Sequence, residues 1–397
     1  MRKIKPESGA LVVLLGALTM ITALAIDMSL PALPTLARDF AATPDQVQLT
    51  LSLFVMGFAL GQLVFGPVSD RFGRRPVLLI GLALYAAAAL ACAFSTSIGM
   101  LVAARVVQGF ASCSGSVLGR AVVRDHFGGD RAAQMFSSLT AVFAAAPLLA
   151  PVIGGWFVVH LGWQAIFGFH AIWALALLAT TWIGLGESLK LRDGQAIHLP
   201  RMLANARTFL SNPICAGNAL VNGLCWAGIF AFLSGSPFIF IELYGISPDH
   251  FGYYFGLGAL ALIAGALTNK RLLRRHHYKR VLKLGFAVVL AGGLLVFVTC
   301  LTGWGGVLAI MLSFVVYIFG QALVMPNALA AAMEPVPRMA GMAAGLMGMI
   351  QMGCGGIAGY AVNALYDGTA LPMGGVILAM AIGTPGIYWA VLRRRAA

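Results

Sequence analysis

Two charged residues lie inside long apolar segments of this sequence. Asp27 is close to the end of the run 9–30, and Arg105 lies about two helical turns into the run 98–122. An ionisable side chain within a membrane segment is costly and by default marks an ion pathway, often with a second charge as its partner. A carboxyl group that burial favours as neutral and a movable cation favours as ionised can bind and release a proton in each cycle. The two residues therefore predict proton coupling, with a static buried pair or an interfacial Asp27 as the alternative.

A second candidate is the stretch "GPVSDRFGRRP" at 66–76, which interrupts the apolar sequence with one acid, three arginines, two glycines and two prolines. We expect a turn on the cytoplasmic side. Pro67 and Pro76 would end the flanking helices, and Gly66 and Gly73 would allow close backbone approach. An acid contributes nothing to the orientation of such a turn, so Asp70 needs another explanation. Asp70 has arginines within one helical turn, which predicts ion pairs that hold together elements that move.

Long apolar segments must position these residues. The chain has 397 residues, of which 60% are hydrophobic and 10% charged, and its mean hydropathy is +0.90. A bilayer core of about 30 Å takes about 20 apolar residues per helix, and no period-two alternation suggests a barrel. We expect an all-α integral membrane protein in which the first segment is a retained helix and not a cleaved signal peptide. The twelve predicted spans are 9–30, 47–68, 77–95, 98–122, 133–159, 164–185, 214–240, 250–269, 282–302, 305–331, 339–363 and 371–392.

The distribution of positive charge predicts the orientation. Of the 26 Lys and Arg residues, all but Arg38 and Arg105 fall in or beside the loops and ends that we assign to the inside. This positive-inside bias places both termini in the cytoplasm. It also explains the net charge of +13 through topology and contact with anionic lipid headgroups, so we expect no nucleic-acid partner.

The cysteines and histidines suggest neither a disulfide framework nor a metal site. All six cysteines fall inside predicted spans, and the seven histidines show no metal-ligand spacing. We expect no cofactor. The sequence has no GxSxG or HExxH motif and no P-loop, which argues against an enzyme and indicates an ion gradient as the energy source.

The predicted spans divide into two halves. We expect a six-helix bundle over 1–187, a cytoplasmic linker over 188–213 and a second six-helix bundle over 214–397. The spacing R-x-x-R-R occurs at Arg71, Arg74 and Arg75 and again at 271–275, each time between the second and third spans of a half. Two related six-helix halves are an arrangement known in secondary transporters, although chance could also place this spacing in a basic loop.

Several stretches of the sequence resemble those of a known family. The stretch "GPVSDRFGRRP" resembles the signature loop of the major facilitator superfamily. Three further stretches are similar to twelve-span drug:proton antiporters, most of all to Bcr/CflA-type exporters. They are "DMSLPALPTLARDF" at 27–40, "LVAARVVQGFASCSGSVLGRAVVRD" at 101–125 and "APLLAPVIGGWFVVHLGWQAIF" at 146–167. The resemblance covers essentially the whole chain, with its motifs concentrated in the first half.

The resemblance implies roles for two groups of residues. It gives Asp70, Arg71 and Arg74, with Gly66 and Gly73, a role in latching the inner gate. It also implies an antiporter-motif hinge at Pro147, Pro151, Gly154 and Gly155. Two departures weaken these assignments. Lys270 stands where Asp70 would repeat in the second half, and Ala144–Ala146 stand where the antiporter motif often has glycine, which loosens the assignment of antiport.

The implied function is proton-coupled efflux of lipophilic, mainly neutral drugs, such as amphenicol- or bicyclomycin-like molecules, across the bacterial inner membrane by alternating access. A monomer is expected. The alternative is an exporter or importer of one specific metabolite with the same fold. Glu242 is expected at the outer mouth of the seventh span, in contact with water. Candidate cavity residues, each of which could instead serve packing, are Phe54, Phe58, Gln108, Ser112, Phe143, Asn222, Trp226, Phe230, Tyr254 and Gln351.

Overall fold

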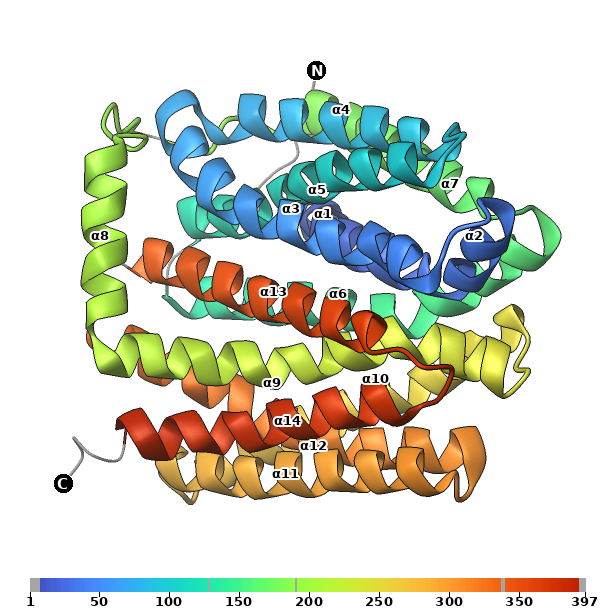
Figure 1. The fold of residues 1–397 in the computed structure, drawn as a ribbon. Helices are drawn as coiled ribbons and strands as arrows, with labels where there is room; N and C mark the ends of the chain where they lie inside the picture. The colour runs from blue at the N-terminus through green and yellow to red at the C-terminus, as the bar shows by residue number, and fades with distance from the viewer. Residues whose placement is uncertain (1–7, 128, 190, 337–339, 393–397) are drawn as a thin grey trace. The chain divides into compact units, whose positions relative to one another are not determined.

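The computed structural model describes residues 8–127, 129–189, 191–336 and 340–392, and every regular element within these ranges is a helix (Figure 1). The chain forms two compact units, which we call unit 1 (Met1–Met202) and unit 2 (Leu203–Ala397). The elements up to residue 184 are α1 (Gly9–Asp27), η1 (Leu30–Ala32), α2 (Leu33–Asp39), α3 (Pro44–Phe72), α4 (Arg74–Ala93), α5 (Ile98–His126), α6 (Gly129–His160) and α7 (Gln164–Gly184). The remaining elements are α8 (Leu199–Ser211), α9 (Pro213–Pro237), η2 (Phe238–Leu243), α10 (Pro248–Leu273), α11 (Tyr278–Thr302), α12 (Gly306–Met333), α13 (Ala340–Ala364), α14 (Leu371–Ile387) and η4 (Tyr388–Leu392).

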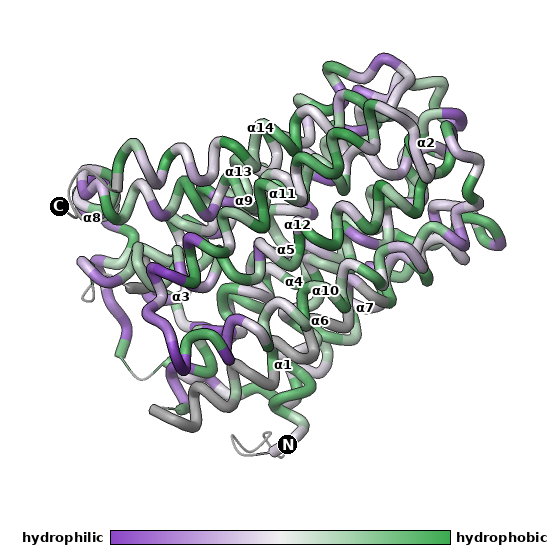
Figure 2. Tube along the Cα trace, turned by 90° about the horizontal axis from the view of Figure 1, so that it is seen from below, coloured by the Kyte–Doolittle hydropathy of each residue, from purple (hydrophilic) through white to green (hydrophobic). Residues whose placement is uncertain are grey.

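Helices of membrane-spanning length make up most of both units. In the described residues, 11 helices are long and apolar enough to cross a bilayer, and the shorter apolar helix Leu149–His160 is the part of α6 that adds to them. The fifth predicted span, 133–159, falls within α6. Figure 2 shows hydrophobic residues along most of the helix lengths and hydrophilic residues mainly toward helix ends and connecting segments. The chain is therefore a multi-pass membrane protein.

The same helix pairing recurs in each unit. In unit 1, α1 packs on α6, α3 on α5 and α4 on α7; in unit 2, α9 packs on α13, α10 on α12 and α11 on α14. In both units the first long helix thus pairs with the fifth, the second with the fourth and the third with the sixth. This is the arrangement expected of two copies of one six-helix bundle.

The boundary between the units, after Met202, lies inside the stretch 188–213 that the sequence suggested as a linker. Part of that stretch forms α8, which the sequence did not predict. Met202, Leu203, Ala206, Phe209 and Leu210 recur at helical spacing, so the apolar residues of α8 share one face and the helix is amphipathic. The helix escaped prediction because it is short and contains Arg201 and Arg207, so no spanning pattern marks it.

The first predicted span, 9–30, is interrupted at Asp27, the last residue of α1. Proline explains this position. In a continuous helix the Asp27 carbonyl would accept from the N–H of residue 31, but Pro31 has none. The chain continues through η1 and α2 as part of one apolar stretch, Gly9–Asp39. Asp27 therefore lies at a helix break within the membrane segment.

The turn predicted at 66–76 is shorter than expected. Helix α3 continues through Gly66 and Pro67 to Phe72, and α4 begins at Arg74, so Pro67 does not end a helix. Only Gly73 separates the two helices, with φ 107° and ψ 151°. Only glycine adopts this backbone conformation readily. A Cβ at Gly73 would also lie 2.5 Å from Glu187 Oε2.

We expect Gly73→Ala to destabilise the protein by about 1–3 kcal/mol, because alanine is strained at this φ and meets the Glu187 carboxylate. Gly66→Ala is the matched control, since a Cβ there meets nothing within 4 Å. The measurement is the thermal unfolding temperature of the purified protein in detergent. Equal unfolding temperatures for the two variants would contradict this account of the turn.

Close approach of α3 and α5 positions the charged residue of α5. A Cβ at Gly109 would overlap the Phe54 carbonyl, and one at Gly57 would overlap the Val106 carbonyl. Small residues allow membrane helices to approach closely. This contact brings Arg105 of α5 against the backbone and side chains of α3.

Candidate functional site

Arg105 is buried in unit 1, with 1% of its surface exposed. Its Nε donates to the Thr50 carbonyl at 3.2 Å, its Nη1 to Gln108 Oε1 at 2.8 Å and its Nη2 to Ser29 Oγ at 3.4 Å. Its Cζ lies 4.2 Å from the centroid of the Phe54 ring. We call these four partners the Arg105 site. The guanidinium uses its planar set of donors and an aromatic face, which a lysine cannot reproduce.

The partners of Arg105 are all neutral, so the site holds a buried positive charge. Within the described residues no ion pair includes Asp27 or Arg105. The sequence suggested a pair of opposite charges, and the structure instead keeps the two groups unpaired. The two groups are linked indirectly, because Ser29, which accepts from Arg105, follows Asp27 by two residues.

Asp27 is itself buried, with 7% of its surface exposed. The helix break beside it is held against α6, since a Cβ at Gly154 would overlap the carbonyl of Met28. Gly155 and Pro151 are also buried, and α6 remains helical through Pro147 and Pro151. Gly154, one of the residues assigned to an antiporter hinge, thus contacts Met28, the residue that follows Asp27. Whether α6 bends there during transport stays a prediction.

Further polar groups of α4 surround the Arg105 site. The Cys92 thiol donates to Gln108 Oε1 at 3.8 Å, and Tyr85, 1% exposed, is an electrostatic neighbour of Arg105. The Tyr85 hydroxyl and Gln108 Nε2 have no hydrogen-bond partner among the described residues. The Tyr85 hydroxyl and the Gln108 amide nevertheless lie close to each other.

His170 of α7 is a buried titratable group that the sequence analysis did not single out. It is 1% exposed, and Arg105 acts on it electrostatically. A signal was present, because His170 lies about 9 Å from the start of its helix and Arg105 about 10 Å from the start of its own. Position inside an apolar run singled out Asp27 and Arg105, and the same criterion applied to histidine would have found His170.

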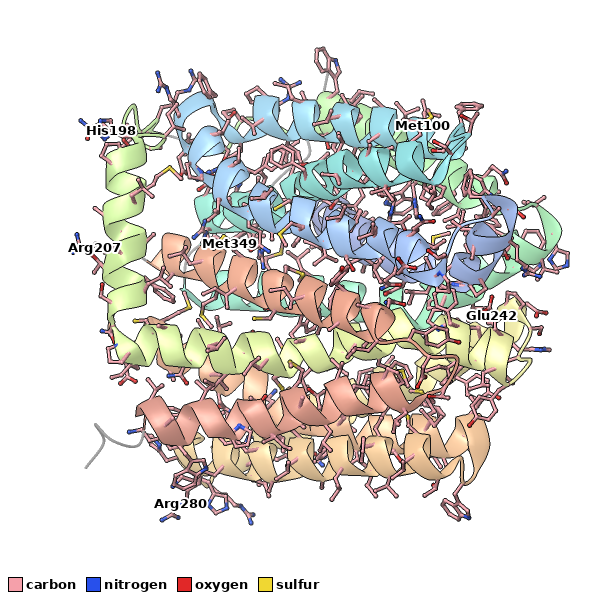
Figure 3. All side chains as sticks on the ribbon, in the orientation of Figure 1. Met100, His198, Arg207, Glu242, Arg280 and Met349 are labelled. Carbon is pink, nitrogen blue, oxygen red and sulfur yellow. The ribbon has the colours of Figure 1, made fainter. Side chains whose placement is uncertain are left out.

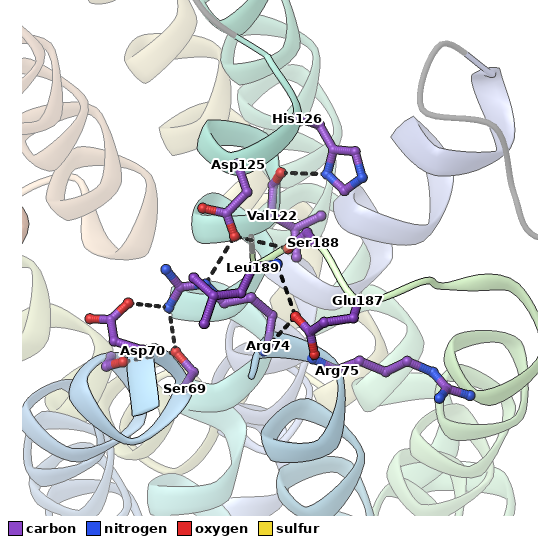
Figure 4. A network of polar contacts seen from close by, with 11 residues as sticks. Ser69, Asp70, Arg74, Arg75, Val122, Asp125, His126, Glu187, Ser188 and Leu189 are labelled. Atoms are coloured by element: carbon purple, nitrogen blue, oxygen red, sulfur yellow. Dashed lines mark hydrogen bonds and ion pairs between the residues drawn. The ribbon is translucent and has the colours of Figure 1, made fainter. Parts of the chain in front are cut away.

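A second polar centre lies at the opposite ends of the unit 1 helices, around Arg74 (Figure 4). Its Nη1 pairs with Asp70 Oδ1 at 2.6 Å and donates to Ser69 Oγ at 2.6 Å, and its Nε pairs with Asp125 Oδ2 at 3.0 Å. Ser188 also donates to Asp125 Oδ2, at 2.9 Å. We call these residues the Arg74 network. It joins α3, α4, α5 and the segment that follows α7.

Glu187 holds the start of α4 in the same region. Its carboxylate accepts from the backbone N–H of Arg74 at 2.9 Å and from that of Arg75 at 3.2 Å. A carboxylate at a helix N-terminus satisfies free N–H groups and complements the helix dipole. The segment after Glu187 is attached as well, since Asp193 N donates to the Asp70 carbonyl at 3.0 Å.

The predicted loop residues differ in their contacts and in their exposure. Asp70 pairs with Arg74, whereas Arg71 is exposed and contacts the ring of Phe72. The family resemblance implies the same role for Arg71 and Arg74, and it does not point to Asp125 or Glu187. Both acids satisfy the argument that singled out Asp70, because an acid beside an inner loop contributes nothing to positive-inside orientation.

We expect Arg74→Ala to lower the stability of the protein by about 2 kcal/mol, because Asp125, whose side chain is 18% exposed, loses its charged partner. Arg71→Ala is the control, since it removes a charge of the same loop that is exposed. Thermal unfolding of both variants in detergent measures the difference. A similar loss in both would show that overall loop charge, and not the Arg74 network, stabilises this end.

The cavity candidates of unit 1 are mostly internal to the bundle. Phe54 and Gln108 belong to the Arg105 site, and Phe58 is buried at 5% exposure. The Ser112 hydroxyl donates to the carbonyl of Gly109 in its own helix at 2.8 Å. The side chain of Phe143 lies outside the described residues.

In unit 2, the candidate Asn222 belongs to a group of buried amides. Asn222 Nδ2 donates to the Met325 carbonyl at 3.3 Å, Gln321 Nε2 to Met325 Sδ at 3.0 Å and Asn218 Nδ2 to the Ile214 carbonyl at 2.9 Å. The three side-chain oxygens have no partner in the described part of the chain. The amide donors are thus used within the protein while three acceptors stay free. We call Asn218, Asn222 and Gln321 the amide cluster.

The aromatic candidates of unit 2 have ring neighbours. Trp226 lies 5.9 Å from Phe230, and Tyr254 lies 5.6 Å from Phe240, between ring centroids. Trp226 Nε1 has no hydrogen-bond partner among the described residues. Gln351 is half-buried. Their contact with a substrate stays a prediction.

Glu242 is exposed in η2, the π-helical segment that follows α9 (Figure 3). Whether water reaches this acid at the outer mouth of the seventh span stays a prediction. Among the residues that the structure describes, no group of acids, histidines and cysteines has the arrangement of a metal site. All six cysteines are free, and five of them are buried.

Comparison with known proteins identifies the family. Residues 15–360 match the description "Major Facilitator Superfamily". The uncharacterized MFS-type transporter YdgK of Bacillus subtilis is 35% identical over 95% of this chain and 94% of its own. The bicyclomycin resistance protein homolog of Haemophilus influenzae is 32% identical over 90% of each chain. The chloramphenicol resistance protein of Pseudomonas aeruginosa is 30% identical over 73% of this chain and 68% of its own.

A solved structure shows the same fold. It is that of a bacterial homolog of the human lysosomal transporter Spinster, inward-facing and occupied, with a TM-score of 0.76 at 12% identity over 98% of this chain and 97% of that chain. The family match and the paired six-helix units agree with this fold. The chain belongs to the major facilitator superfamily of transporters, and its relatives group it with the Bcr/CflA-type drug exporters of that superfamily.

Proposed function

We propose that this protein exports neutral, lipophilic drugs across the bacterial inner membrane in exchange for protons. The names of two relatives, a bicyclomycin resistance protein homolog and a chloramphenicol resistance protein, suggest the chemical class of the substrate. Both termini would lie in the cytoplasm, and transport would proceed by alternating access in a monomer.

The single observation that carries the proposal is the buried Asp27 at a helix break. It lies two residues before Ser29, a neutral partner of Arg105, whose positive charge has no ion-pair partner among the described residues. A neutral, protonated Asp27 is compatible with an Arg105 that uses only neutral partners. A deprotonated Asp27 would attract the guanidinium strongly in this poorly solvated region. Proton binding at Asp27 and the position of Arg105 are therefore expected to change together, which couples the proton to a structural change.

The charges of the described residues favour neutral substrates. Asp27 is the buried acid among them, and Arg105 adds a buried positive charge to the same unit, so a permanent cation would meet repulsion. The amide cluster of unit 2 offers three free acceptors instead. These oxygens suit the hydroxyl and amide N–H donors that amphenicols carry, provided that the cluster becomes accessible during the transport cycle.

The Arg74 network is proposed to stabilise the closed inner gate. It joins three helices to the segment after α7, and its ion pairs connect side chains from different elements. Pairs of this kind can form in one conformation and separate in another, which biases the population of the two states.

The proposal is tested by measuring drug susceptibility and drug accumulation in cells that express the protein, with and without a protonophore. We expect lower accumulation of chloramphenicol and higher resistance, both lost when the protonophore is added. Protection that persists without a proton gradient, or no effect on any amphenicol, would contradict the proposal.

A further inference from the structure

The imidazole of His170 is buried without the hydrogen bonds that normally accompany a buried polar group. Neither Nδ1 nor Nε2 has a partner within the described residues, and the Leu24 carbonyl of α1 lies near the ring without completing a hydrogen bond. The rings of Phe167 and Phe169 lie 6.0 and 6.3 Å away, between centroids. Each unpartnered polar atom costs about 1–3 kcal/mol, so a phenylalanine would pack better in this aromatic cluster.

Contacts from three elements connect His170 to the proposed coupling residues. Arg105 Cζ lies 5.7 Å from the Phe167 ring, which is the edge-to-face neighbour of the His170 ring. Leu24 precedes Asp27 by about one turn on α1. Arg105 and His170 therefore contact the same Phe167 ring, and His170 lies near the turn of α1 that precedes Asp27.

The groups around His170 include few that carry charge. Helix α7 packs on α1, α4 and α6. Helix α1 contributes Asp27, and α4 contributes Tyr85 and Cys92, which face Arg105. In the described part of α6 the titratable group is His160, which is exposed and bonded to the Trp156 carbonyl at 2.9 Å. Among the described residues, Arg105 is thus the permanently charged cation that a charge on His170 would meet.

We propose that His170 exchanges the transported proton with Asp27 while Arg105 changes its partner. This inference rests on the proposed function. In one state Asp27 is protonated, Arg105 occupies its present site and His170 is neutral. In the other state the O–H bond of Asp27 has broken, the proton has passed through water to a ring nitrogen of His170, and Arg105 pairs with the Asp27 carboxylate.

Charge balance supports this exchange. The three groups carry a total charge of about +1 in either state, so the buried region gains no net charge when the proton moves. A protonated His170 next to Arg105 in its present site would place two cations in one apolar region, which is strongly unfavourable. Departure of Arg105 removes this repulsion. Imidazole is also the side chain that binds and releases protons most readily near neutral pH.

The test compares two transport modes of the purified protein in liposomes. Drug–drug exchange, in which labelled chloramphenicol equilibrates with unlabelled chloramphenicol, needs no proton transfer, whereas export driven by a pH gradient does. We expect His170→Gln to reduce export driven by the pH gradient at least 10-fold and to leave drug–drug exchange within 2-fold of wild type. His170→Phe fills the aromatic cluster without a titratable group and should give the same result.

The matched control is His160→Gln, which removes an exposed histidine of α6 and should behave as wild type in both modes. If both His170 variants retain export driven by the pH gradient, or lose both transport modes equally, the exchange is wrong and His170 serves packing. If the wild-type protein shows no export driven by a pH gradient, the proposed function itself fails, so the two failures are distinguishable.

Discussion

Arg105→Lys is expected to reduce proton-driven export of a neutral drug by about 100-fold. The guanidinium makes three hydrogen bonds in three directions and lies against the Phe54 ring. One ammonium group cannot keep all of them, and the loss of two hydrogen bonds to a charged group is about 3 kcal/mol, or about two factors of ten. The measurement is the initial export rate from liposomes under a fixed pH gradient.

The matched control for this variant is Arg124→Lys. Arg124 belongs to the same helix, α5, but its side chain is exposed, so the substitution should leave the rate close to that of the wild type. Full activity of Arg105→Lys would show that only a positive charge is needed and that the planar geometry of the Arg105 site is unimportant.

Asp27→Asn is expected to abolish uphill export. The amount of drug moved against its concentration gradient should then equal that in protein-free liposomes. The amide preserves the size and polarity of the side chain but cannot bind and release a proton. Drug–drug exchange should persist, because the fold around the helix break depends on Pro31 and on the contact between Gly154 and Met28. Both transport modes are measured with labelled chloramphenicol in the same liposome preparation.

Asp45→Asn provides the control for Asp27→Asn. Asp45 is an exposed acid in the first turn of α3, and its replacement should change neither mode. Uphill export that survives in Asp27→Asn would remove this residue from the coupling mechanism and transfer the role to another titratable group, of which His170 is the buried candidate.

The membrane helices were predictable because their signal is strong and local. About 20 apolar residues are needed to cross a bilayer, and this requirement alone identified most of the spans. The helix break at Asp27 was also encoded locally, in Pro31 four residues later. The helix α8 was missed because an amphipathic segment with two arginines carries no spanning signal.

The partners of the candidate site residues were harder to predict, because they depend on which helices pack together. Position along the sequence suggested that Asp27 and Arg105 form a pair, yet Arg105 bonds to the Thr50 carbonyl of α3 and to Gln108 of its own helix. A backbone carbonyl carries no sequence signal. In the loop at 66–76, spacing could not distinguish Arg71 from Arg74, and only the fold shows which of them faces Asp125.

The central claim is that a proton gradient drives export of neutral drugs. The most direct measurement uses liposomes with the reconstituted protein, under a pH gradient alone and under a voltage alone. One proton exchanged for one neutral molecule moves charge, so voltage should contribute about 2.3 kcal/mol per 100 mV for each charge moved. We predict that a neutral amphenicol is exported under either gradient, and a quaternary ammonium dye only weakly. Strong export of the dye without export of the amphenicol would contradict the account. An amphenicol export rate that depends on neither the pH gradient nor the voltage would also contradict it.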